Sequence, residues 1–428
     1  MATQEGFAQA HNDSLVFAFD GADLVNGFKG PPSTNLIGSI QYAYGEQNSD
    51  LFKTHYGTRK ALIPHLGEKT VHYVDIYIDY NGGYGNCCLS LFSFGQAPVS
   101  QYNTYYYQII YRTVNDYYHP NYMYQYQYGS NGYITEYGVH NPSNRYHLGD
   151  GWYMAWGTIT TPPSISYLQC YLFHYEYATY NRVELAGVMI NNVNYHFSPR
   201  AFLNPGETRS ATQSLIDLTG RNTIDVSNCS IGPWLATYIL PATGVGITET
   251  TEQLRSAINF DGSDDRLVVT PGSTITLNDY TIEVVFRLFT PIPSKRQYLV
   301  DPRGDGGESN SPLYLLVDTS PNQMTIVGGN SNYEVTSPSI TPDSNRNHVV
   351  LTRSGSTCKI YWNGDEVASG DTGSAQLTIA NAFRIGTYSA GSSGQYFLYG
   401  NMSVARIYSK ALTEEQIKNN YTKYKHYL

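Results

Sequence analysis

The stretch YGNMSVARIYSKALTEEQI, residues 399–417, contains two kinds of secondary-structure signal. Its first part, residues 401–409, is rich in apolar and β-branched residues and is a strand candidate. Thr413 and Gln416 then form a capping box, in which the threonine oxygen accepts from the Gln416 N–H and the glutamine side chain reaches back. The residues that follow, 417–424, are compatible with a helix. The stretch therefore predicts a strand followed by a short C-terminal helix.

The rest of the chain indicates β-structure. Short runs that alternate between polar and apolar residues are separated by Gly, Pro, Asn and Ser, a pattern typical of sandwiches and barrels. The chain has 428 residues and 41 tyrosines, which suit a pleated, half-buried surface. We expect an all-β protein with two jelly-roll or β-sandwich domains. The other strand candidates are 14–20, 71–80, 103–114, 122–129, 166–177, 182–190, 265–269, 280–288, 313–318, 347–355, 358–368 and 382–388.

Charge and composition argue against several classes of partner. The formal net charge is −9 and no basic block offsets it, so we expect no nucleic acid ligand. We also expect no membrane partner, because no apolar run is long enough to span a bilayer. The first residues, MATQEGFAQAHND, lack the pattern of a secretory signal. The five cysteines are odd in number and scattered, which favours folding in a reducing cytoplasm over a disulfide framework.

Five segments, in order, resemble a known jelly-roll family. They are INFDGSDDRLVV (258–269), YTIEVVFRL (280–288), NHVVLTRSGSTCKIYWNGDEVASG (347–370), FRIGTYS (383–389) and the stretch at 399–417. Together they resemble the LamG-like domain, the laminin G type 3 form of the concanavalin A-like jelly roll. Phe286 stands where the family usually has Trp, and residues 345–347 depart from the usual aromatic before His348. These departures bear on the transfer of sugar binding, not on the architecture.

Two further resemblances suggest how the first half is organised. Residues 151–190 resemble the end of a carbohydrate-binding-module-like β-sandwich, which TNLIGSI (34–40) would open. Residues 14–28 and 208–228 resemble the lead-in of LamG-bearing virion proteins of tailed bacteriophages, which implies that LVFAFD (15–20) lies beside VARIYS (404–409). The domains implied are a docking arm at 1–12, a lead-in and connector at 13–33 plus 198–256 that packs with the LamG-like domain, an inserted sandwich at 34–197 and the LamG-like jelly roll at 257–428.

Aromatic residues in the inserted sandwich are candidates for surface contacts. In residues 105–129 the period-two pattern predicts two neighbouring strands joined by the turn NDYYHPN (115–121). One face of the second strand would carry Tyr122, Tyr124, Tyr126 and Tyr128, and Trp152 and Trp156 would share a face of another strand. Both sets are candidates for glycan or subunit contact, and core packing is the alternative. We favour the core for the two tryptophans.

Carboxylates offer one candidate metal site and one candidate catalytic pair. Asp261, Asp264 and Asp265 could supply oxygen ligands for calcium, although a β-turn held by Asp side chains is the favoured interpretation. We expect no other cofactor. Glu176 and Glu184 form the best local pair for glycoside hydrolysis. Because no catalytic motif accompanies them, we expect a protein that is not an enzyme.

The function that these resemblances imply is structural. We expect an exposed capsid fibre, capsid decoration or tail fibre component of a bacteriophage particle that binds glycans for adhesion. It would be made in the host cytoplasm and located in the virion. Its partners would be other virion proteins and surface glycans, and we expect a homo-oligomer, with a trimer favoured. The alternatives are a glycan depolymerase of the tail and a soluble calcium-dependent lectin.

Overall fold

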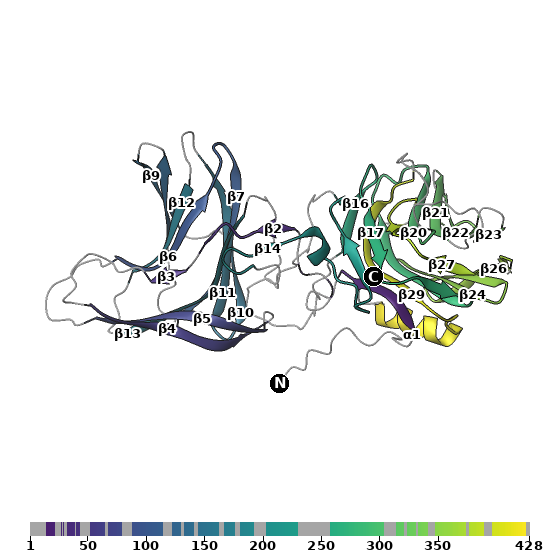
Figure 1. Cartoon of the computed structure of the whole chain (residues 1–428), viewed down its shortest axis with the longest axis horizontal. Coiled ribbons are helices and arrows are strands. Elements are labelled where there is room, and N and C mark those ends of the chain that lie inside the picture. Colours follow the sequence, from purple (N-terminus) through teal and green to yellow (C-terminus); the bar gives the residue numbers. More distant parts are fainter. Residues whose placement is uncertain are drawn as a thin grey trace. The chain divides into compact units, whose positions relative to one another are not determined.

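The computed structural model is an all-β protein with a helix near the end of the chain (Figure 1). Its chain divides into two compact units: unit 1 comprises residues 1–31 and 210–428, and unit 2 comprises residues 32–209. In the part of the chain that is described, no helix is long and apolar enough to cross a bilayer. The residues described are 14–21, 27, 29, 32–38, 40–42, 52–64, 67–78, 88–113, 122–129, 132–140, 144–161, 167–175, 180–191, 203–229, 257–303, 314–320, 323–330, 333–340, 347–373, 376–388 and 396–424.

Unit 1 contains two large antiparallel sheets. The first runs in the order β1 (Leu15–Asp20), β29 (Tyr399–Tyr408), β19 (Tyr280–Leu288), β24 (Asn347–Ser354), β25 (Thr357–Trp362) and β26 (Asp365–Asp371), and β16 (Ile258–Asp261) also pairs with β29. The second runs in the order β15 (Asn222–Asp225), β17 (Leu267–Pro271), β28 (Phe383–Ile385), β20 (Arg296–Asp301), β21 (Tyr314–Ser320), β22 (Gln323–Asn330) and β23 (Tyr333–Thr336). A short ladder joins β18 (Ile275–Leu277) to β27 (Leu377–Ile379). One large apolar core contains side chains from both sheets.

Strand β1 completes the first sheet although nearly 200 residues separate it from the next part of unit 1. The predicted pairing of residues 15–20 with 404–409 is present, with Phe19 opposite Ala405. Phe17 and Phe19 are fully buried, and the Phe17 ring meets Phe383 of the second sheet edge to face at 5.4 Å. Asp217 fixes the strand, since its Oδ1 accepts from the Ala18 N–H at 2.9 Å. Segments on both sides of unit 2 therefore build the same core.

The predicted helix and capping box are both present. Helix α1 spans Glu414–Tyr424. The Thr413 N–H donates to the Gln416 side chain at 3.0 Å, and the Gln416 N–H donates to Thr413 Oγ1 at 3.3 Å. The helix is tied to the sheet through a buried carboxylate, because Asn420 Nδ2 donates to Glu283 Oε1 at 2.9 Å. This polar anchor fixes the position of the helix on β19.

Unit 2 also contains two antiparallel sheets. The six-stranded sheet runs in the order β10 (Asn144–Gly149), β11 (Trp152–Thr160), β7 (Thr104–Thr113), β13 (Tyr180–Asn191), β5 (Gly67–Ile78) and β4 (Phe52–Ile63). The five-stranded sheet runs in the order β3 (Gln41–Tyr42), β6 (Cys88–Pro98), β12 (Tyr167–Tyr175), β8 (Tyr122–Gly129) and β9 (Gly132–His140).

The two ends of unit 2 lie side by side. Strand β2 (Ser33–Thr34) pairs with β14 (Thr208–Arg209). Asn35 reinforces the closure, because its Nδ2 donates to the backbone oxygens of Val188 and Leu203 at 2.9 and 3.1 Å. Residues 203–209, which the sequence suggests belong to the lead-in, thus pack with the inserted sandwich.

The six-stranded sheet is buried on both faces and curls. One apolar cluster contains Tyr107, Ile109 and the Ala97 side chain of the five-stranded sheet. The cluster on the other face contains Ile63 of edge strand β4 and Leu148 of the opposite edge strand β10. Since side chains from both edges meet in one cluster, the sheet bends until its edges approach each other.

The tyrosine-rich stretch forms two strands, but the predicted hairpin is wrong. Strand β7 pairs with β11 and β13, whereas β8 pairs with β12 and β9 in the other sheet. A period-two pattern indicates a strand and its two faces, but it carries no information about the partner. Strand β7 is buried from Tyr105 to Tyr111 on both faces, so its tyrosines are core residues.

Candidate functional site

A cluster of aromatic rings surrounds one guanidinium in unit 1. Tyr298 of β20, Tyr314 of β21, Tyr388, Tyr396 and Arg303 form this group, which we call the tyrosine cluster. The Arg303 guanidinium carbon lies 4.4 Å from the ring centre of Tyr314 and 4.9 Å from that of Tyr388. Tyr298 is the hub of the rings, with centres at 5.2 to 5.9 Å from the other three.

The cluster lies on the sheet face that points away from the apolar core. Along β21, Leu315 and Val317 enter the core, so the alternate residues Tyr314 and Leu316 face the other way. Tyr314 is buried, whereas Tyr388 and Tyr396 are half-buried. The outer two rings thus form the solvent side of the cluster.

Arg303 is held in place by a buried carboxylate. Its Nε and Nη2 donate to the two oxygens of Asp301 at 2.7 and 2.9 Å, and Asp301 is fully buried. Burial opposes the charge on Arg303, but the hydrogen bonds and charge of Asp301 raise its pKa further above its usual value. For Tyr298 and Tyr314, burial disfavours the charged phenolate and therefore raises the pKa. The cluster therefore has neutral phenols and a fixed cation whose side chain is only 8% exposed. Its half-buried tyrosine rings are groups that can stack on sugar rings.

No local sequence pattern marks this cluster. Its members lie at 298, 303, 314, 388 and 396 and share no motif. Strand order alone brings them together, since β20 pairs with both β21 and β28. The tyrosines on the outward positions of β20 and β21 could have indicated the cluster only if the pairing register of these two strands had been known.

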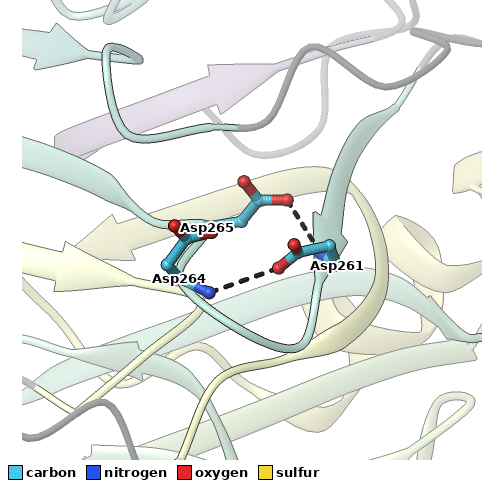
Figure 2. A group of neighbouring side chains, drawn as sticks. All are labelled: Asp261, Asp264 and Asp265. Carbon is cyan, nitrogen blue, oxygen red and sulfur yellow. Dashed lines mark hydrogen bonds between the residues drawn. The ribbon is translucent and has the colours of Figure 1, made fainter.

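The predicted calcium ligands gather at the end of β16 and on the turn that follows it, where Asp261, Asp264 and Asp265 have carboxylate atoms within 4.8 Å of one another (Figure 2). The Asp261 N–H donates to Asp265 Oδ2 at 2.7 Å, and Asp261 Oδ1 accepts from the N–H groups of Ser263 and Asp264 at 2.7 and 3.3 Å. These bonds are the ones that a β-turn held by Asp side chains requires.

A neighbouring cation reduces the fit of this turn to calcium. Lys295 Nζ donates to the Gly262 carbonyl at 2.9 Å. Burial lowers the pKa of Lys295, and the charge of Asp261 offsets part of that shift. Carboxylate oxygens suit calcium, but Asp261 and Asp265 already accept backbone hydrogen bonds and an ammonium lies beside them. Calcium at this turn stays a prediction.

The aromatic candidates of unit 2 have different positions. Trp152 on β11 is 1% exposed and packs with Ile110 and Met154, so its proposed surface contact is wrong and the core alternative holds. The reason is that the curl of the sheet closes over that face. Trp156 follows on the same strand, and its side chain lies outside the described residues.

The four alternate tyrosines of β8, Tyr122, Tyr124, Tyr126 and Tyr128, lie on one strand between β12 and β9. Their side chains lie outside the described residues, so their glycan or subunit contact stays a prediction.

An ionic network, which we call the arginine cluster, occupies the curled sheet of unit 2. It consists of Arg59 on β4, Asp75 on β5, Arg112 on β7, and Arg182 and Glu184 on β13. Glu184 is fully buried and Asp75 is 3% exposed. Glu184 is one half of the carboxylate pair considered for catalysis, and Glu176 lies outside the described residues.

The state of Glu184 does not suit a general acid. Burial opposes its ionisation, but the hydrogen bond from Arg59 and the charge of Arg112 hold its pKa below the usual value. A glycosidase needs a carboxylic acid whose pKa is raised. Glu184 is therefore a fixed anion that binds arginines.

Residues 261–418 match the family model of the concanavalin A-like lectin/glucanases superfamily, Laminin_G_3. This part of unit 1 is a concanavalin A-like jelly roll. The match agrees with the five motifs from which the fold was expected. No curated protein sequence matches the chain.

The chain is also similar in part to solved structures, three of which follow with their identities, coverages and TM-scores. The chain is 18% identical to a CBM40 of the Ruminococcus gnavus IT-sialidase bound to α2,3 sialyllactose (34% of this chain, 82% of that one, TM-score 0.28). It is 14% identical to domain 4 of a GH43 extracellular arabinanase from Geobacillus stearothermophilus in complex with arabinotriose (49% and 92%, TM-score 0.31). It is 15% identical to a heptameric SAP-like pentraxin from Limulus polyphemus (37% and 78%, TM-score 0.31). At these TM-scores the likenesses say nothing about a ligand of this chain.

Proposed function

We propose that this protein is a non-catalytic glycan-binding protein that binds sugar rings at the tyrosine cluster. The observation that carries the proposal is the cluster of four tyrosine rings on the outward face of the concanavalin A-like jelly roll, three of which lie against Arg303. Half-buried Tyr388 and Tyr396 would offer ring faces, and the buried Asp301 keeps the guanidinium in place without a ligand. A site held rigid before binding loses less entropy when the sugar arrives.

The state of the buried carboxylates supports binding without catalysis. Glu184 is clamped by arginines. In unit 1, burial opposes the ionisation of Glu283, but the hydrogen bond and charge of His348 hold its pKa below the usual value. Tyr408 donates to the second oxygen of Glu283 at 2.7 Å. Neither group has the raised pKa of an acid that protonates a leaving group.

We further propose that the protein is an exposed component of a tailed-phage particle, as a capsid fibre, capsid decoration or tail fibre. What supports this is the lead-in resemblance, together with the part that its residues play in the fold. Asp217, within that lead-in, accepts from the N–H of Ala18 and of Asn222 at 2.9 Å each, and so joins the two halves of the lead-in. An assembly with many copies, with a trimer as the expected unit, would turn weak sugar contacts into firm adhesion.

The glycan proposal is tested on the whole chain with an array of neutral and charged glycans. We expect wild type to bind a defined set of glycans, and the Tyr388→Ala and Tyr396→Ala variants to lose that binding. Tyr102→Ala serves as the matched control, because Tyr102 is 72% exposed and lies in unit 2. If no glycan binds, or if all three variants bind as wild type does, the tyrosine cluster is not a sugar site.

The virion proposal and its rivals require separate measurements. Mass spectrometry of purified particles should detect the polypeptide, and its absence would remove the virion role. A depolymerase would shorten a bound polysaccharide over time, which we do not expect. A calcium-dependent lectin would lose glycan binding in EDTA and in an Asp264→Asn variant. We expect neither change because Asp261 and Asp265 already accept backbone hydrogen bonds and Lys295 lies beside them.

A further inference from the structure

The arginine cluster of unit 2 contains more positive charge than its own carboxylates balance. Arg59 donates through Nε and Nη2 to Glu184 Oε1 and Oε2, each at 2.7 Å. Arg112 approaches the same carboxylate, with Nε and Nη2 at 2.8 and 2.6 Å from Oε2. Two guanidiniums therefore share one carboxylate, which leaves one positive charge uncompensated within this trio.

The neighbouring ion pair is balanced and does not neutralise this excess. Arg182 donates through Nε and Nη2 to the two oxygens of Asp75 at 2.5 and 2.8 Å. His55, whose side chain is 70% exposed, lies 3.5 Å from Asp75 through Nδ1. The pair adds one charge of each sign, so the five described members of the cluster have a net charge of +1.

The excess charge faces solvent rather than the interior. The Arg59 side chain is 33% exposed and that of Arg112 is 26% exposed, whereas Glu184 beneath them is fully buried. The Nη1 atoms of the two arginines make only long contacts, to the Lys60 carbonyl at 3.4 Å and the Asp150 carbonyl at 3.5 Å. Two donors of fixed guanidiniums thus remain weakly used at the surface.

The two guanidiniums are also held in fixed orientations. Glu184 binds both from below, and Arg112 lies over the buried Trp152 ring at 5.1 Å. Arginine forks match the planar geometry of a carboxylate, and such charge-assisted pairs are among the stronger hydrogen bonds in proteins. One carboxylate balances only one of the two guanidiniums, so the pair keeps one positive charge and two weakly used Nη1 donors for an external anion.

We propose that Arg59 and Arg112 form a second binding site, specific for the carboxylate of an acidic saccharide such as a uronate. The saccharide part of this inference rests on the proposed glycan-binding function, whereas the anion part rests on the cluster itself. The site is in unit 2 and shares no residue with the tyrosine cluster. The protein would then bind a neutral sugar ring at the tyrosine cluster and an acidic sugar at Arg59 and Arg112.

Isothermal titration of the full chain with hexagalacturonate and with its fully methyl-esterified form tests the site. We expect the acid to bind about tenfold more tightly than the ester at low salt, and the preference to decrease as salt is added. Arg59→Lys keeps the charge but loses the fork, and Arg112→Gln loses both. We expect Arg59→Lys to weaken the preference for the acid while keeping its salt dependence, and Arg112→Gln to remove both.

Controls separate this site from the proposed tyrosine site and from a purely structural network. Circular dichroism melting identifies any variant that fails to fold. If Arg112→Gln does not fold, Arg59→Lys alone provides the test. The Tyr396→Ala variant should keep the full acid preference. If folded arginine variants bind the acid as wild type does, or if wild type shows no preference, this site is overturned and the tyrosine site is untouched. If the arginine variants lose the acid while Tyr396→Ala binds every glycan normally, the tyrosine site fails and this one stands.

Discussion

At the scale of single residues, one glycine explains a family motif. Gly386 closes the FRIG motif with a φ of +85°, and a Cβ there would lie 2.3 Å from a ring carbon of the buried Phe260. Gly355, at the turn between β24 and β25, has a φ of +60° and nothing within 4 Å of its Cβ position. The first glycine is required by packing as well as by backbone conformation, the second by conformation alone.

Replacing each glycine by alanine separates these two requirements. Both variants place alanine in the left-handed region, at about 1 kcal/mol. Gly386→Ala must also displace a core ring, so we expect it to lower the free energy of unfolding by about 2 kcal/mol more. Urea unfolding of the two variants measures the difference. Equal losses would mean that Phe260 does not pack against Gly386.

The ion pairs of Glu184 should make the stability of unit 2 depend on pH. Its folded pKa lies below the usual value, so its ion pairs stabilise unit 2 above the unfolded pKa of about 4.3. That stabilisation is lost as the pH falls through the lower, folded pKa. We expect Glu184→Gln to cost about 2 kcal/mol at pH 7, and the gap from wild type to shrink as the pH falls below 4. A gap that is the same at pH 7 and pH 3 in urea unfolding would contradict the assignment.

At the scale of elements, β1 packs into a core whose other residues lie between positions 215 and 407 of the chain. Phe17 and Phe19 are fully buried in the core of unit 1. We expect Phe17→Ala to lower the free energy of unfolding of unit 1 by about 3 to 5 kcal/mol. Leu15→Ala on the same strand is the control, because Leu15 is only half-buried, and should cost about 1 kcal/mol. Similar small losses for both would show that β1 is dispensable.

The elements also show what a sequence can predict. Strand β19 has the expected bounds, 280–288, and the capping box at Thr413 starts the helix as expected. Both depend on local patterns. The predicted pairing of β8 with β7 is wrong, and the tyrosine cluster was not predicted, because both depend on the order of strands that are distant in the sequence. Asp261, Asp264 and Asp265 were found together because they lie within five residues on one turn.

At the scale of the whole molecule, the chain enters unit 2 through β2 and leaves it through β14, two strands that pair with each other. Since Ser33 pairs with Arg209 and Thr34 with Thr208, a short Gly-Ser linker in place of residues 34–208 should span the gap. We expect this shortened chain to keep the unfolding midpoint of unit 1 and to lose the preference for acidic glycans. Aggregation or a broad, non-cooperative melt would show that unit 1 requires unit 2 to fold.

The proposed function rests on the tyrosine cluster of unit 1, and one titration tests it directly. The full chain is titrated with the strongest neutral glycan from the array, alongside a Tyr388→Ala/Tyr396→Ala double variant and the Tyr102→Ala control. We expect the double variant to weaken binding at least about tenfold, since stacked aromatic contacts contribute about 1 kcal/mol or more each, and the control to bind as wild type does. A folded double variant with unchanged affinity would contradict the account.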